Sequence, residues 1–361
     1  MMGTKLMQQR LGRPPRTVLV AGAQVPFQRG GAEWHLEALR QELVRRGLTT
    51  DVVQLPFSWD PRREALRSLL SWRLLDVSQA AAVPIDLVIA TRFPSYALRH
   101  PNKIVWLFHP FRQAYDLHEA GIDGFPDTPE GRALRRHVIE LDTRLLKECR
   151  ALFTTSDNNA RRLDRYTGLR AEVLRLPLQD PRRWHFEGLG DYVLSVGRLE
   201  PLKRTELLVR AATQLPAPLR VVIVGEGSQR AALESLARDL GVDGRVEFRG
   251  FLADEEVRLL YARCGAVFYA PFDEDYGLVT LEAFEARKPV VTTSDAGGPL
   301  EFVRDGENGL VTPPEPVPIG RALARLLEDR PLARRLGEAG HASTRGLNWD
   351  RVIERLVEAG S

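Results

Sequence analysis

The stretch AVFYAPFDEDYGLVTLEAFEARKPVVTTS, residues 266–294, reads as a strand, a loop, a helix and a second strand. Two short apolar runs flank a segment with helical spacing, so the stretch predicts a βαβ unit of a parallel sheet. Its loop places Asp273, Glu274 and Asp275 directly before the helix. Three interpretations are open: a metal site at the D-x-D pair, a capped helix start, or a pocket that grips a hydroxyl-rich substrate.

The same alternation of apolar runs and helical patterns extends along the whole chain, which indicates parallel βαβ layering. The first series of expected strands covers 17–22, 50–56, 86–91, 103–109, 151–156 and 171–177, with helices at 31–46, 62–78, 130–149 and 158–166. The second series covers 192–197, 219–225, 245–250, 266–271, 289–294 and 309–314, with helices at 203–215, 228–240, 254–263, 277–287 and 299–303. The predicted fold class is α/β, with two doubly wound, Rossmann-like domains facing a cleft.

The domain boundaries follow from composition. Segment 179–191, QDPRRWHFEGLGD, breaks the periodicity with proline, glycine and charge, and is the expected linker. We expect a first domain over 17–185 and a second over 186–345. Residues 346–361 should carry a last helix, at 349–359, that packs back on the first domain. Residues 1–16 are basic without an apolar core, which predicts a disordered leader and not a signal peptide.

Length and composition set the class of protein. At 361 residues, two domains are the natural expectation, and 43% hydrophobic with 27% charged residues is typical of a soluble globular protein. No apolar run approaches the roughly 18 residues that span a bilayer. Two cysteines, Cys149 and Cys264, predict reduced core thiols and a cytoplasmic protein, and no nucleic-acid partner is expected.

Charge is distributed unevenly along the chain. Residues 1–185 hold 29 Lys and Arg against 20 Asp and Glu, whereas the remainder holds 22 against 28. The asymmetry favours an anionic partner on the first half, and dispersed surface charge is the competing explanation. The candidate arginines for such a partner are Arg29, Arg62, Arg63, Arg67, Arg73, Arg92, Arg112, Arg135 and Arg136.

In open α/β sheets, ligands bind where strand ends lead into helices, so the loops after the strands deserve the closest reading. Gly30 and Gly31 precede the first helix and would let an anion approach backbone N–H groups, although a flexible turn is the simpler explanation. His109 follows the strand at 103–109, where it could donate or accept a hydrogen bond, or serve a structural role.

The second half carries the stronger pattern. Arg198 and Lys203 lie near a helix start, where the helix dipole disfavours cations unless they face a polyphosphate. VGEG (224–227) and Gly297-Gly298 supply further glycine turns before helices, each a weak signal alone. Glu274 and Glu282 are separated by seven residues, E-x7-E, with Gly277 allowing close backbone approach.

That spacing suits a nucleotide sugar. The backbone N–H groups of Leu278 and Val279 would face a phosphate, while the two carboxylates accept hydrogen bonds from hydroxyl groups. A Rossmann dehydrogenase is disfavoured, because G-x-G-x-x-G is absent.

Together, GRLEPLKR, VGEG, EDYGLVTLEAFEARKPVVTT and GGPLEFV resemble the donor domain of retaining glycosyltransferases of family 4, the glycosyl transferases group 1, which have the GT-B fold. The likeness is strongest over 190–315. GGAEWHLEALRQELVRRG and LFHPFRQAYD resemble the matching first-domain segments more loosely. The departure is Arg287-Lys288, where relatives often carry a small residue and glycine, and it bears on the helix end.

The resemblance implies a role for each candidate. Arg198 and Lys203 would neutralise the diphosphate, Glu282 would hold the ribose, and Glu274 would bind hydroxyls of the transferred sugar. The Tyr276–Val279 turn would complete the donor site. His109 would face the sugar from an acceptor-binding first domain, and the Gly30-Gly31 loop would lie over the phosphates or the acceptor.

The chemistry implied is metal-independent and needs no cofactor, so D-x-D is the weaker interpretation of Asp273 and Asp275. The donor would be a GDP-, UDP- or dTDP-linked hexose or deoxyhexose, as in mannosyltransferase-like relatives. The acceptor would be a glycan or a lipid-linked glycan of surface polysaccharide or glycoconjugate synthesis, reached by peripheral contact with the inner face of an anionic membrane. A nucleotide-sugar 2-epimerase of similar fold and a sugar-nucleotide-binding protein without activity are the alternatives.

Overall fold

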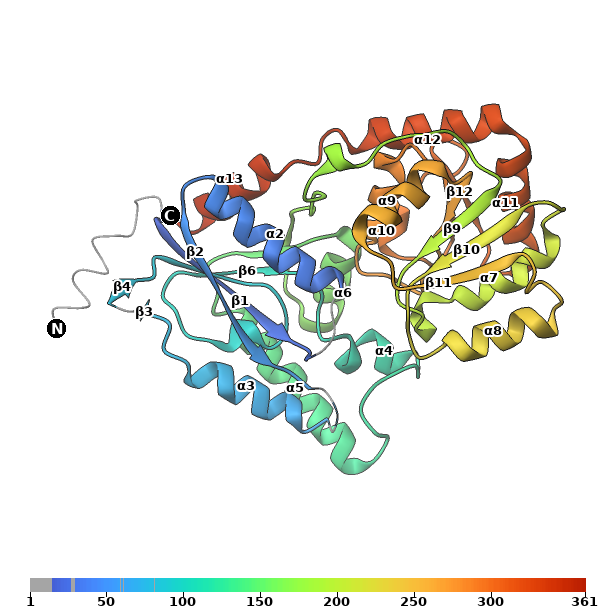
Figure 1. The fold of residues 1–361 in the computed structure, drawn as a ribbon. Coiled ribbons are helices and arrows are strands. Elements are labelled where there is room, and N and C mark those ends of the chain that lie inside the picture. Colours follow the sequence, from blue (N-terminus) through green and yellow to red (C-terminus); the bar gives the residue numbers. More distant parts are fainter. Residues whose placement is uncertain (1–14, 27–29, 59, 61, 81) are drawn as a thin grey trace, which may run out of the picture. The chain divides into compact units, whose positions relative to one another are not determined.

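The computed structural model describes residues 15–26, 30–58, 60, 62–80 and 82–361, and the chain divides into two compact units. Unit 1 comprises the chain up to Pro177 together with Asn348–Ser361, and unit 2 is Leu178–Leu347. Figure 1 shows each unit as a sheet covered by helices. Residues 1–14 of the expected leader lie outside the described residues.

Unit 1 contains a six-stranded parallel sheet in the order β2-β1-β5-β6-β7-β8. Its strands are β1 (Thr17–Gln24), β2 (Thr49–Pro56), β5 (Leu87–Ala90), β6 (Lys103–Leu107), β7 (Leu152–Thr154) and β8 (Glu172–Val173), and a separate hairpin pairs β3 (Gln79–Ala80) with β4 (Val83–Pro84). Every residue of β5 and β6 is buried, which explains their continuous apolar sequence.

Helices cover both faces of this sheet. They are α2 (Gly31–Arg45), α3 (Glu64–Leu74), α4 (Asp116–Glu119), α5 (Pro129–Leu146), α6 (Asp157–Thr167) and α13 (Trp349–Ala359), with 3₁₀ turns η1 (Ser95–Ala97) and η2 (Arg112–Ala114). Helices α2 and α13 lie on one face, and α3 and α5 lie on the other (Figure 1). The main core of the unit fills the α3–α5 side, with Trp72, Tyr96 and Val138 fully buried.

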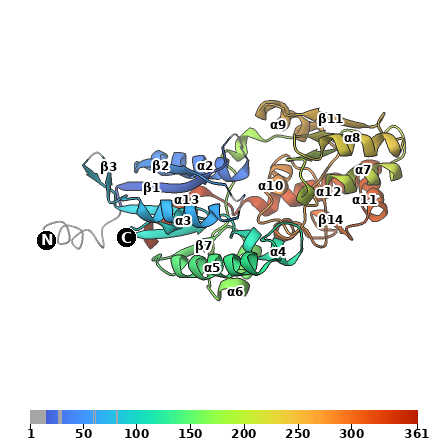
Figure 2. The same cartoon turned by 90° about the horizontal axis from the view of Figure 1, so that it is seen from below.

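Unit 2 repeats the design with the order β11-β10-β9-β12-β13-β14, again all parallel. Its strands are β9 (Tyr192–Val196), β10 (Arg220–Val224), β11 (Val246–Gly250), β12 (Ala266–Phe268), β13 (Val290–Thr293) and β14 (Gly309–Thr312). Its helices are α7 (Thr205–Ala211), α8 (Arg230–Asp239), α9 (Asp254–Arg263), α10 (Leu278–Glu285), α11 (Pro316–Glu328) and α12 (Arg330–Thr344), with 3₁₀ turns η3 (Pro181–Arg183), η4 (Pro201–Lys203), η5 (Ala212–Gln214) and η6 (Gly298–Glu301). One core packs α7, α8 and α11 on the sheet and another packs α9 and α10; Figure 2 shows the unit from below.

The twelve expected strands are all present, within a few residues at their ends, and the doubly wound α/β prediction is confirmed. Helices α11 and α12 were not predicted. Prolines stand at their starts, where a helix tolerates them, and glycines interrupt their pattern. Those glycines allow close packing: a Cβ on Gly337 would lie 2.1 Å from the Arg287 carbonyl oxygen. The helix expected at 299–303 is the four-residue turn η6.

Segment 179–191, the expected linker, packs on unit 2, which begins at Leu178. Trp184 meets Tyr261 edge-on at 5.1 Å between ring centroids. The buried Lys288 donates to the Gly188 carbonyl and lies 4.3 Å above the Phe186 ring, and burial lowers its pKa to about 8. Lys288 thus anchors the segment.

The expected last helix is α13, and it belongs to unit 1. Trp349 begins the helix and meets the buried Trp106 of β6 edge-on, with ring centroids 6.0 Å apart. Beyond the helix, Asn102 donates to the Gly360 carbonyl. The chain therefore returns to unit 1 after completing unit 2.

Candidate functional site

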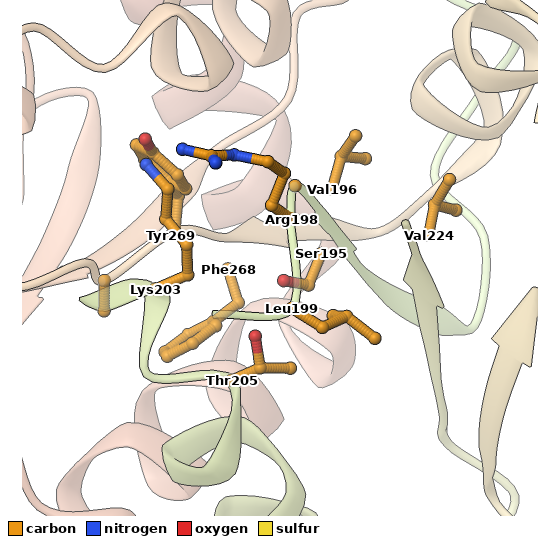
Figure 3. A pocket seen from close by; sticks show the side chains of 11 residues that line it. Ser195, Val196, Arg198, Leu199, Lys203, Thr205, Val224, Phe268 and Tyr269 are labelled. Carbon is orange, nitrogen blue, oxygen red and sulfur yellow. The ribbon is translucent and has the colours of Figure 1, made fainter. Parts of the chain in front are cut away.

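The loop after β9 brings both predicted phosphate-binding cations to one pocket. Arg198 is exposed, and among the described residues it has no ion-pair partner. Lys203 ends η4, donates to the Glu274 carboxylate, and lies 5.8 Å from the centroid of the Tyr269 ring. Both side chains line a pocket with Tyr269, and Figure 3 shows Arg198 extending toward Lys203. The sequence predicted both cations on this loop, but not that Lys203 pairs with Glu274.

Glycine turns hold this loop in place. The Leu199 N–H donates to Glu226 O at 2.9 Å, and the Gln229 N–H donates to Leu199 O at 2.9 Å. A Cβ on Gly225 would lie 1.9 Å from the Gly197 carbonyl oxygen. The VGEG turn therefore provides close packing of two loops, which is a structural reason for its glycines.

Arg204, which sequence reasoning passed over, fastens three loops together. Its guanidinium donates to the carbonyls of Ala270 and Pro271 at 3.0 and 2.9 Å, and to the Asp295 carboxylate at 2.7 and 2.8 Å. The hydrogen bonds from Arg204 lower the pKa of Asp295. Of two adjacent basic residues, Lys203 faces the pocket and Arg204 is structural. The dipeptide itself contains no signal that separates them.

The acidic loop after β12 pairs with the loop after β13. The Glu274 N–H donates to Ala296 O at 2.8 Å, and the Gly298 N–H donates to Glu274 O at 2.7 Å. A Cβ on Gly297 would lie 2.7 Å from the Glu274 backbone, so the Gly297-Gly298 pair permits this contact. The Gly297-Gly298 pair was predicted to start a helix that accepts an anion. The helix that follows is only the four-residue 3₁₀ turn η6, which offers little support for that role.

No group of three or more His, Cys, Asp or Glu side chains is arranged to hold a metal ion in the described part of the chain. Asp275 is buried, at 9% exposed, and Asp273 has a left-handed backbone, with φ of 43°. The expectation that catalysis needs no metal stays a prediction.

Helix α10 starts as the sequence indicated. Gly277, with φ of 92°, precedes it in a conformation that glycine accepts readily. Leu278 and Val279 are its first two residues, so their N–H groups have no partner within the helix. The Tyr276 ring is buried against Phe302, with ring centroids 5.2 Å apart, so the ring is part of the packing of unit 2.

Glu282, one and a half turns into α10, is partly buried. Tyr261 of α9 donates to its Oε2 at 2.9 Å. Burial raises the pKa of Glu282 to about 7, and the Tyr261 hydrogen bond opposes that rise. A carboxyl group poised near neutrality can accept hydrogen bonds from hydroxyls once it ionises.

In unit 1, the predicted residues lie at strand ends. His109 follows β6, and its Nδ1 is 2.8 Å from the Pro110 carbonyl oxygen. The Gly30 N–H donates to Glu33 Oε2 at 2.9 Å, and Arg92 donates to Glu33 Oε1 at 2.8 Å. The first turn of α2 thus already satisfies the Gly30 amide with its own carboxylate, which competes with an external anion there; Gly31 begins the helix.

Most of the arginines proposed for an anionic partner are engaged within unit 1. Arg29 lies outside the described residues. Internal ion pairs join Arg62 to Asp123, Arg67 to Glu64, Arg73 to Glu148, Arg92 to Glu33, and Arg112 to Asp116. The net charge of the first half therefore overstates the cationic surface available to a ligand. Across the described residues, no helix combines the length and apolar character needed to cross a bilayer.

Comparison with known proteins adds to this geometry. Residues 180–343 match the family model of glycosyl transferases group 1. The D-inositol 3-phosphate glycosyltransferase of Nocardia farcinica is 38% identical over 180 residues, covering 47% of this chain and 40% of that protein. The lipopolysaccharide core biosynthesis glycosyltransferase LpsE of Rhizobium meliloti is 36% identical over 160 residues, covering 43% and 44%. The chain thus spans less than half the length of these two relatives.

Among solved structures, HepE of Anabaena in complex with UDP and glucose superposes with a TM-score of 0.70 at 19% identity, covering 95% of this chain and 98% of that one. This likeness concerns the fold, and the two six-stranded units are those of the GT-B fold.

Proposed function

Because residues 180–343 carry the glycosyl transferases group 1 domain in a chain with the GT-B fold, we propose that the protein is a retaining glycosyltransferase of family 4 type. It would move a hexose or deoxyhexose from a nucleoside-diphosphate sugar to a glycan or lipid-linked acceptor. The observation that carries the proposal is the pocket lined by Arg198 and Lys203, with Glu274 paired to Lys203.

The donor would lie along the carboxyl edge of the unit 2 sheet. Arg198 and Lys203 bind the diphosphate, Leu278 and Val279 offer N–H groups at the dipole end of α10, and Glu282 accepts from the ribose. Glu274, which pairs with Lys203 in the structure, exchanges that cation for hydroxyl groups of the sugar. The bound UDP and glucose of HepE suit such a donor, and UDP, GDP and dTDP are all candidates.

The proposed chemistry is front-face transfer. The bond from the sugar to the diphosphate breaks as the acceptor oxygen bonds to the same face of the sugar, and the leaving diphosphate takes the acceptor's proton. Arg198, Lys203 and the start of α10 stabilise the charge that develops on the leaving group, and preorganised charges of this kind usually supply the largest catalytic term. His109 is the sugar-facing residue proposed for unit 1.

Cationic side chains already provide the counter-charge, so we propose that transfer needs no metal. The measurement is transfer in EDTA, with Mg²⁺ or Mn²⁺ added back. Loss in EDTA and recovery with metal would assign Asp273 and Asp275 as ligands and overturn this part.

The acceptor side rests on the relatives, two of which act on inositol phosphate or lipopolysaccharide core according to their names. We propose a surface polysaccharide or glycoconjugate acceptor, and a cytoplasmic protein that touches the inner membrane face peripherally.

A thermal-shift screen of UDP, GDP and dTDP tests the donor assignment, because a ligand that binds the native state raises its apparent stability. The donor so identified is then incubated with the protein alone. Epimer formation without acceptor would favour a nucleotide-sugar 2-epimerase, and binding without any turnover would favour a binding protein.

A further inference from the structure

One oxygen of the Glu282 carboxylate is already occupied within unit 2. Tyr261 of α9 donates to Oε2 at 2.9 Å. Among the described residues no other group donates to this side chain, so Oε1 has no hydrogen-bond partner there, and Oε1 is not buried. Oε1 is therefore the oxygen that remains for a ligand.

Packing fixes the ring of Tyr261. The residue is fully buried, in the core that packs α9 and α10 on the sheet. Trp184 meets the ring edge-on, with the ring planes at 85°. A buried hydroxyl without a partner costs stability, so the fixed ring favours the arrangement in which its hydroxyl donates to Glu282. Tyr261 thereby restricts the orientation of the Glu282 carboxylate.

The charge of Glu282 acts on a wall of the pocket that Arg198 and Lys203 line. Tyr269 lines the same pocket. Burial, and then the charges of Glu274 and Glu282, raise the pKa of Tyr269. The orientation and ionisation of Glu282 therefore matter to a ligand in this part of unit 2.

Helix α9 also supplies the other groups that act on Glu282. Burial raises the pKa of Glu282 to about 7, and the Tyr261 hydrogen bond opposes that rise. The charge of Asp254 raises the pKa further, and the charge of Arg258 lowers it. Arg258 is itself paired with Glu255 at 2.7 Å. Of these groups, Tyr261 is the one that donates a hydrogen bond to the carboxylate.

We propose that Tyr261 is a positioning residue for Glu282, because by holding Oε2 it presents Oε1 to a ribose hydroxyl of the donor. The same hydrogen bond favours the carboxylate, which accepts, over the carboxylic acid. The inference rests on the proposed function, which gives Glu282 the ribose. It deepens that function by assigning the orientation and ionisation of Glu282 to a residue of the neighbouring helix.

The test uses Tyr261→Phe, which removes the hydroxyl and keeps the ring against Trp184. The matched control is Tyr192→Phe, because the Tyr192 hydroxyl donates to the Leu260 carbonyl of the same helix at 2.7 Å, and not to a carboxylate. Calorimetry from pH 6 to pH 9 measures the affinity for UDP, GDP and dTDP.

We expect Tyr261→Phe to weaken nucleoside-diphosphate binding by about tenfold at pH 7 and by about twofold at pH 9, because without its donor the carboxyl group ionises only at higher pH. Tyr192→Phe should follow the native profile. A loss of the same size at every pH would be the mark of a merely structural role, and it would overturn the proposal.

A second measurement needs no ligand. ¹³C NMR of protein labelled at the side-chain carboxyl carbon of glutamate follows the titration of Glu282, with Glu282→Gln used for assignment. The midpoint should be higher in Tyr261→Phe than in the native protein, and unchanged in Tyr192→Phe.

The two measurements separate the proposal from the function on which it rests. An unchanged midpoint in Tyr261→Phe would refute the role of Tyr261 even if the protein binds a diphosphate and transfers a sugar. If none of the three diphosphates bound, the proposed function and the ribose contact would fail, while a raised midpoint would still assign the ionisation of Glu282 to Tyr261.

Discussion

Replacing Glu274 by Gln should affect nucleotide binding and sugar transfer in opposite directions. In the structure, Glu274 neutralises Lys203, and the two side chains are 19% and 21% exposed, so solvent screens their attraction only in part. An incoming diphosphate has to break this pair before Lys203 can bind phosphate. Gln keeps the shape of the side chain and removes the competing charge.

The size of the effect follows from the contact that is broken. A charge-assisted hydrogen bond contributes about 1.5–3 kcal/mol. If about half of that is recovered when the carboxylate charge is removed, nucleoside-diphosphate binding tightens by about 0.8–1.5 kcal/mol, or about four- to thirteenfold. Transfer should fall by about a hundredfold, because Glu274 is then a weaker acceptor for the hydroxyls of the reacting sugar.

Isothermal titration calorimetry with the diphosphate found in the screen measures the first effect, and initial rates with the full donor measure the second. Glu200→Gln is the matched control. The Glu200 carboxylate lies on the same loop as Lys203 but accepts from Ser228 Oγ at 2.6 Å. Removing its charge therefore leaves the pair of Lys203 and Glu274 intact. Weaker binding of the diphosphate to Glu274→Gln would refute the exchange of partners.

Five further outcomes are expected. Arg198→Ala and Lys203→Ala should each weaken diphosphate binding by about 1.5–3 kcal/mol without unfolding the protein; unchanged affinity in both variants, by calorimetry, would reject the phosphate assignment. Because burial raises the pKa of Glu282 to about 7, diphosphate binding should strengthen from pH 6 to 8 as the carboxylate ionises, and Glu282→Gln should flatten that profile. The same raised pKa stabilises the fold fully below about pH 4.5, and that contribution is lost as the pH rises through about 7, which urea titrations of the two proteins would reveal. Arg287→Gly should raise the free energy of unfolding by up to about 1 kcal/mol, because Arg287 has φ of 55° and its exposed ion pair with Glu338 contributes little; a loss of stability in urea would contradict this. Sedimentation with anionic liposomes should show binding at low salt that disappears at high salt, and no binding at low salt would remove the membrane contact from the proposal.

Most of the fold could be predicted from the sequence, because strands and helices leave local patterns of apolar residues. Buried parallel strands such as Leu87–Ala90 and Lys103–Leu107 are continuous apolar runs, and the helices between them repeat with helical spacing. Helices α11 and α12 were not predicted, because Gly337 and similar residues look like helix breakers until their packing partners are known.

The candidate site was readable only in part. Residue types near strand ends made Arg198, Lys203, Glu274 and Glu282 candidates, since ligands collect at that edge of a parallel sheet, and their roles stay predictions. Their pairing was not readable, because Lys203 and Glu274 are 71 positions apart and meet only through the sheet order. Arg287 follows α10 with φ of 55°, so the departure noted in sequence falls at a left-handed backbone position, which sequence alone did not reveal.

The return of the chain to unit 1 has a consequence for synthesis on the ribosome. Unit 1 is assembled from two segments, and the second, Asn348–Ser361, is translated only after all of unit 2. Until then the nascent first sheet lacks Trp349, which covers Trp106, and the Gly360 carbonyl, which accepts from Asn102. Unit 1 therefore cannot complete its folding before unit 2 has been synthesised, so the two units do not fold in strict order from the N-terminus. All residues of unit 2 are synthesised before the last segment of unit 1. Unit 1 thus completes its packing last, although its synthesis starts first.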